Sequence, residues 1–102
     1  AMDIARLVQD SMRQIESSMG VNLASDSLGY NRLASHVRYM IARARKGERA
    51  SLDMQDYART SFPKPYEVAK MVCRYMEKRL GIPLAPEETG FLAIHIQRVM
   101  QQ

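Results

Sequence analysis

This chain has few of the residues that would indicate a secreted, membrane-bound or metal-binding protein. Its single cysteine, Cys73, cannot form an intrachain disulfide. No apolar run approaches the ~18 residues that a bilayer-spanning helix needs, and the N-terminus has neither the basic segment nor the apolar stretch of a secretion signal. The two histidines stand far apart, and no cysteine or acidic residue lies at metal-ligand spacing beside them. We therefore expect a cytoplasmic protein with no membrane segment, no metal site and no cofactor.

Signs of enzymatic chemistry are also lacking. There is no glycine-rich phosphate loop, and Cys73 lies in a helix-like run with no activating base, which is typical of a core cysteine. The acidic pairs Asp53/Asp56 and Glu87/Glu88 lie at expected helix starts, where carboxylates favour the positive end of the helix dipole. We expect no catalytic turnover.

The composition is that of one ordinary globular domain. Of the 102 residues, 46% are hydrophobic and 25% are charged, and no segment is of low complexity. Apolar residues recur at intervals of three or four almost throughout, whereas no segment shows the period of two that marks strands. The sequence predicts an all-α fold, a compact five-helix bundle that occupies residues 1–102 as a single domain.

Capping and turn residues place the expected helices along the chain. Gly20 and Gly47 are suited to end the first two helices, and Ser51 is suited to cap the third. The third helix is expected to run through Leu52, Met54, Tyr57 and Ala58. Proline is tolerated in the first turn of a helix, so the last two helices are expected to begin at prolines. The five predicted helices span about residues 4–19, 28–46, 52–62, 65–80 and from 86 to near the C-terminus.

The positive charge of the chain is concentrated in one segment. Residues 38–49 contain five Lys or Arg residues against Glu48 alone, a local balance of +4 that equals the net charge of the whole chain. Such a segment favours an anionic partner, whether a phosphate group, a nucleic acid backbone or an acidic protein face. A solvated helix end explains it equally well, because cations also favour the negative end of the helix dipole.

His36 and His95 are the candidate reactive residues. Neutral imidazole can attack a phosphoryl donor near physiological pH. In a helix, Arg32 lies one turn before His36 and Arg43 two turns after it, while Arg98 lies one turn after His95. Arginine suits a phosphorylated imidazole, since its guanidinium forms charge-assisted hydrogen bonds with phosphate oxygens. Spacing alone, however, favours two packed histidines on apolar faces.

Three motifs, in order, resemble the PTS regulation domain, the PRD family found in BglG/SacY-type transcriptional antiterminators and related transcription regulators. The motifs are the segments 30–43, 62–69 and 80–98, which include Tyr30-Asn31-Arg32-Leu33-Ala34-Ser35-His36, Phe62-Pro63-Lys64-Pro65-Tyr66 and Phe91-Leu92-Ala93-Ile94-His95-Ile96-Gln97-Arg98. The resemblance covers about residues 5–101. It implies a five-helix bundle that forms a homodimer.

The resemblance also implies a function. His36 and His95 fall on the family's two phosphorylatable histidines, and Arg43 and Arg98 fall where the family often has arginine. The implied partners are the histidine-containing phosphocarrier protein or a sugar-specific enzyme II of the sugar phosphotransferase system. Phosphorylation would control transcription or antitermination through the dimer or conformational state, with Arg32, Arg43 and Arg98 stabilising the phosphate. The domain itself would bind neither nucleic acid nor membrane.

Two other classes of protein remain open from the residues alone. A helical nucleic-acid-binding domain would use the basic segment on phosphates, and its affinity would fall steeply with salt and survive loss of both histidines. A purely structural dimerisation module would bind neither a phosphoryl donor nor nucleic acid.

Overall fold

The computed structural model describes residues 3–101, which fold into five helices and contain no strand. The predicted all-α, five-helix architecture is therefore confirmed. The helices are α1 (Ile4–Met19), α2 (Leu28–Lys46), α3 (Gln55–Ser61), α4 (Pro63–Leu80) and α5 (Glu87–Met100).

The ends of α1 and α2 follow the capping residues. The side chains of Asp3 and Ser27 accept hydrogen bonds from backbone N–H groups in the first turns of the two helices. Gly20 and Gly47 end them with φ values of 70° and 71°, in the left-handed region that glycine adopts without steric cost. These boundaries agree with those predicted.

The start of α3 was predicted too early. The helix begins at Gln55 and not after Ser51, because the Asp53 side chain accepts a hydrogen bond from the Gln55 backbone N–H and holds the preceding residues in a turn. Leu52 and Met54 therefore precede the helix instead of lying in it. Leu52 is 63% exposed, and Tyr57 within the helix is 51% exposed. Ala58 is the buried residue of this helix.

The start of α4 was predicted too late. The helix begins at Pro63, with Pro65 also in its first turn, and not at Pro65 alone. Both prolines are tolerated there because the first N–H groups of a helix have no intrahelical acceptor.

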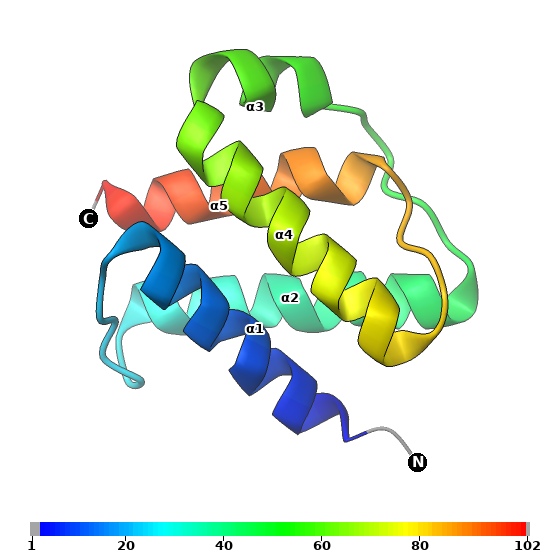
Figure 1. The fold of residues 1–102 in the computed structure, drawn as a ribbon, viewed down its shortest axis with the longest axis horizontal. Coiled ribbons are helices and arrows are strands. Elements are labelled where there is room, and N and C mark those ends of the chain that lie inside the picture. Colours follow the sequence, from blue (N-terminus) through cyan, green and yellow to red (C-terminus); the bar gives the residue numbers. More distant parts are fainter. Residues whose placement is uncertain (1–2, 102) are drawn as a thin grey trace.

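The helices form two crossed antiparallel pairs (Figure 1). α1 and α4 make one layer, while α2 and α5 run side by side in opposite directions behind it, and α3 packs against α4 and α5. The molecule measures 33 × 30 × 19 Å. This arrangement places the middle of α2 next to the middle of α5.

The core lies between the two layers and collects apolar side chains from all five helices. Cys73 belongs to it, as predicted, and burial raises the pKa of its thiol to about 12. The fully buried large apolar side chains are Leu7, Met12, Ile15, Leu33, Val37, Met40, Ile41, Val72, Met76, Leu92 and Ile96.

Gly90 allows a close approach between α5 and the start of α3. A Cβ atom at this position would lie 2.9 Å from the backbone nitrogen of Gln55 and 2.9 Å from the carbonyl carbon of Met54. Backbone atoms cannot move aside as a flexible side chain can, so any larger residue would push α5 away from α3.

Over residues 3–101, none of the helices combines the length and the apolar character required to span a membrane.

Candidate functional site

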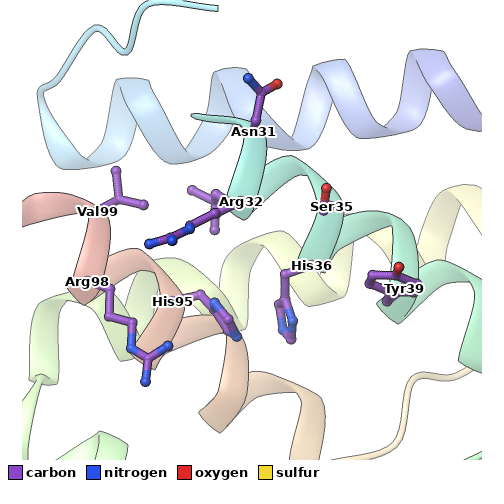
Figure 2. A pocket seen from close by; sticks show the side chains of 9 residues that line it. Asn31, Arg32, Ser35, His36, Tyr39, His95, Arg98 and Val99 are labelled. Carbon is purple, nitrogen blue, oxygen red and sulfur yellow. The ribbon is translucent and has the colours of Figure 1, made fainter. Parts of the chain in front are cut away.

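His36 of α2 and His95 of α5 meet where the two antiparallel helices pack. Their imidazole rings stack, with centroids 3.9 Å apart and an interplanar angle of 24°. His36 directly precedes buried Val37, and His95 directly precedes buried Ile96, so each imidazole lies at the edge of its helix's buried stripe. Figure 2 shows the two rings side by side between the helices. Residues that lie far apart in the sequence thus form one site.

The paired rings line a pocket of about 380 Å³ between α2 and α5. Arg32 and Arg98 also line it, and both are exposed residues. In Figure 2 their side chains extend on the α5 side, and Tyr39 lies at the opposite end. The complete lining is Asn31, Arg32, Leu33, Ser35, His36, Tyr39, His95, Arg98 and Val99. The pocket therefore combines two imidazoles with two guanidinium groups that face solvent.

Both imidazoles are neutral at physiological pH. Burial, followed by the nearby His95 and the positive charge of Arg43, lowers the pKa of His36 from 6.5 to about 3. Burial and the charge of Arg98 also lower the pKa of His95. In addition, the His36 Nε2 atom is buried and has no hydrogen-bond partner. A neutral imidazole has one nitrogen with a free lone pair, which is the form that acts as a nucleophile.

Arg43 lies outside this pocket lining, unlike the other two arginines proposed to hold phosphate. Its guanidinium donates two hydrogen bonds of 2.7 Å to the carboxylate of Glu88, in a bidentate pair. Glu88 is 1% exposed. Arg43 therefore acts on His36 through its charge, while two of its N–H donors bond Glu88 at the start of α5.

A second ion pair lies beside the first. Arg49 donates hydrogen bonds of 3.0 and 2.6 Å to the carboxylate of Glu87. Both acids do occupy the first turn of α5, as the dipole argument expects, but their arginine partners were missed because the pairs span 38 and 45 residues of sequence. Two of the five cations of the basic segment, Arg43 and Arg49, are thus paired with carboxylates. Fewer cations remain to contact the phosphates of a nucleic acid, so the nucleic-acid-binding alternative is weakened.

His95 is also reached from the α3 side. Together with Arg98 it borders a second pocket of about 630 Å³ that has a mainly apolar wall. The lining residues that the second pocket does not share with the first are Leu52, Met54, Tyr57, Phe62, Phe91, Ile94, Gln97 and Gln101. His36 does not line it, so His95 is the more accessible histidine.

The fold and the site together define a class of protein. It is an all-helical domain in which two neutral histidines lie in a pocket that arginines also line. Residues 9–99 match the family model of the PRD domain, and the chain belongs to that family. The resemblance seen in the three motifs is therefore confirmed.

Similar proteins come from species of Staphylococcus and Bacillus. The chain is 27% identical to Protein GlcT of Staphylococcus haemolyticus over 97% of its length and 36% of the relative's. It is 23% identical to Transcription antiterminator LicT of Bacillus subtilis over 99% of its length and 38% of the relative's. The chain thus spans little more than a third of these relatives.

A solved structure has the same fold. The crystal structure of GlcT CAT-PRDI superposes with a TM-score of 0.82 at 22% identity, over 95% of this chain and 56% of that one. At this identity the likeness supports the five-helix architecture alone.

Proposed function

We propose that this domain is a regulatory phospho-acceptor, in which His36 and His95 receive phosphoryl groups and thereby control transcription or antitermination. The observation that carries the proposal is the stack of two neutral imidazoles, 3.9 Å apart, in a pocket that Arg32 and Arg98 also line. A pair of histidines that served only as core packing would not need two solvent-facing guanidinium groups beside it.

The reaction is a transfer between two nitrogen atoms. The lone pair of one imidazole nitrogen attacks the phosphorus of a donor phosphohistidine, a new N–P bond forms, and the donor's N–P bond breaks with its electron pair returning to the donor ring. The attacking nitrogen carries no proton, so no general base is required. The lowered pKa of each histidine keeps that nitrogen free at neutral pH.

The three arginines contribute differently. Arg32 and Arg98 line the pocket and are exposed, and we assign them to the oxygens of the phosphoryl group, where guanidinium groups form charge-assisted hydrogen bonds. Arg43 stabilises the same group through its positive charge, because it lies outside the pocket lining and two of its N–H donors bond Glu88. This division refines the expectation that all three hold phosphate directly.

Phosphorylation is expected to change the structure because it adds a bulky, charged group to the edge of a partly buried ring. A phosphoryl group adds nearly two negative charges and three oxygens. It bonds in the plane of the imidazole ring, at the ring edge, and on His36 the Nε2 edge is buried. Phosphorylation therefore favours a state in which α2 and α5, or two copies of the domain, are arranged differently. The change would be largest in a homodimer whose two-fold axis passes through the surface of α2 and α5 that carries the histidines, because both copies would add charge there.

The names of the relatives support a regulatory role over an enzymatic one. LicT is named a transcription antiterminator, and a protein of Staphylococcus carnosus with 22% identity is named the GlcA/glcB genes antiterminator. The donors that fit the proposal are the histidine-containing phosphocarrier protein and a sugar-specific enzyme II.

Incubation with phosphoenolpyruvate, enzyme I and the phosphocarrier protein tests the proposal. Wild type is expected to acquire acid-labile phosphate, His36→Ala and His95→Ala to acquire less, and the double variant none. A parallel reaction replaces the phosphocarrier with candidate enzyme II domains. Absence of label in wild type with every donor would contradict the proposal, as would equal labelling of the double variant.

A further inference from the structure

The ion pair between Arg43 and Glu88 repeats the spacing of the histidine pair. On α2, Arg43 follows His36 by seven residues (43 − 36), and on α5, His95 follows Glu88 by seven residues (95 − 88). Seven residues are about two helical turns and about 10.5 Å, so each arginine or glutamate lies on nearly the same helix face as its histidine. Because α2 and α5 are antiparallel, the ion pair and the imidazole stack form two matching cross-connections between the same helices.

From this match we propose that Arg43 and Glu88 are a positioning pair, which fixes the register of α5 on α2 and thereby holds His95 against His36. The inference rests on the proposed function for its biological role, since the stack is the proposed phospho-acceptor. Its structural content does not depend on phosphorylation.

The geometry of the pair suits a fixed register. Two parallel hydrogen bonds of 2.7 Å constrain both the distance and the orientation of the guanidinium, which a single bond would not do. The Glu88 side chain is 1% exposed, so sliding α5 along α2 would leave a carboxylate buried without its partner. A shift of α5 by one residue is therefore strongly disfavoured.

The neighbouring pair of Arg49 and Glu87 provides a natural comparison. Arg49 lies beyond the end of α2, its side chain is 67% exposed, and it ties the loop after Gly47 to α5. Its charge is not among those that lower the pKa of His36, whereas that of Arg43 is. Loss of the Arg49 pair removes the same chemical groups from the same end of α5 without removing a connection to α2.

The test compares two double variants in unphosphorylated protein. Arg43→Met/Glu88→Met removes both charges at once, so that no unpaired charge stays buried, and Arg49→Met/Glu87→Met is the matched control. Nuclear Overhauser effects between the ring protons of His36 and His95 report the stack, and NMR titration of the same protons reports each pKa. His95 and Arg43 act on the pKa of His36. The charged residues that line the pocket are Arg32 and Arg98, which neither variant alters.

We expect the Arg43/Glu88 variant to lose the ring–ring effects and the pKa of its His36 to rise by about half a unit or more. The Arg49/Glu87 variant is expected to keep both. Arg43→Lys keeps the charge but loses the bidentate geometry, and it should weaken the ring–ring effects while the helical content by circular dichroism stays unchanged.

Retention of the stack and of the His36 pKa in both Arg43 variants would overturn the positioning role. Equal losses in the Arg49/Glu87 control would overturn it as well. Because these readouts need no phosphoryl donor, a wild-type protein that stacks its rings but accepts no phosphate would contradict the proposed function and leave the positioning pair intact.

Discussion

At the residue scale, the two imidazoles owe their chemistry to their surroundings. Burial is the largest cause of the lowered pKa of both His36 and His95, and a nearby arginine adds to it in each case. The sequence could indicate the arginines, because helical spacing places them near the histidines. It could not indicate the burial of one ring by the other, because the stack joins residues from two distant helices.

The lowered pKa of His36 makes stability depend on pH. Its folded-state pKa of about 3 lies below the ordinary value of 6.5, so between these values the unfolded chain binds a proton that the folded protein does not. The contribution of neutral His36 to the free energy of unfolding is therefore fully present above about pH 6.5. It is lost on acidification, by up to about 1.4 kcal/mol per pH unit for each such proton. Urea unfolding between pH 7 and pH 5 measures this slope, and His36→Leu is expected to make it shallower. An unchanged slope in His36→Leu would contradict the burial of a neutral ring.

Arg98 is expected to affect the rate of phosphorylation and not the stability of the fold. It is exposed at the end of α5 and lines both pockets that border His95. Removal of its guanidinium in Arg98→Ala should slow phosphorylation of His95 about tenfold, the lower end of the cost of losing one hydrogen bond to a charged group. The rate of acid-labile labelling measures it, with Arg74→Ala, exposed on α4, as the control. Equal rates in Arg98→Ala and Arg74→Ala would exclude Arg98 as a phosphate ligand.

At the element scale, the helices follow local rules except where a side chain intervenes. The spacing of apolar residues and the capping residues predicted five helices and the ends of α1 and α2. The start of α3 was missed because the Asp53 side chain competes with the helix for the Gln55 N–H, a local choice that periodicity does not reveal. The partners of Glu87 and Glu88 were missed because tertiary contacts, and not helix rules alone, determine where such acids bind.

Gly90 is expected to be indispensable for the packing of α5 on α3. An exposed helical glycine replaced by alanine would gain up to about 1 kcal/mol of helix propensity, but the new Cβ at this position lies 2.9 Å from backbone atoms of Met54 and Gln55. We expect Gly90→Ala to lower the free energy of unfolding by about 1–3 kcal/mol, the usual range for overpacking. Thermal or urea unfolding measures the change. A variant more stable than wild type would show that α3 moves aside without loss of stability, and would contradict the prediction.

At the scale of the whole molecule, the site lies between helices that phosphorylation should separate. The α2–α5 contact is one of several that hold the bundle, and α1 packs on α2 and α4 on the other side. A dianion at the edge of either ring should loosen the α2–α5 contact while the α1–α4 contact persists.

Hydrogen exchange of the phosphorylated protein measures this loosening. Amide exchange is expected to accelerate in α2 and α5 near the two histidines and to stay slow in the centre of α1, with the unphosphorylated protein as the reference. Uniform protection before and after phosphorylation would contradict a conformational response within one domain. The response would then have to lie between two copies of it.

The most direct test of the central claim is phosphorylation by a small-molecule donor, because it requires no particular protein partner. Potassium phosphoramidate transfers its phosphoryl group to neutral imidazole with release of ammonia, and ³¹P NMR detects the resulting phosphohistidine. The account predicts a phosphohistidine signal in wild type that is reduced in His36→Ala and in His95→Ala and absent from the double variant. A wild-type protein that stays unphosphorylated while free imidazole reacts under the same conditions would contradict it.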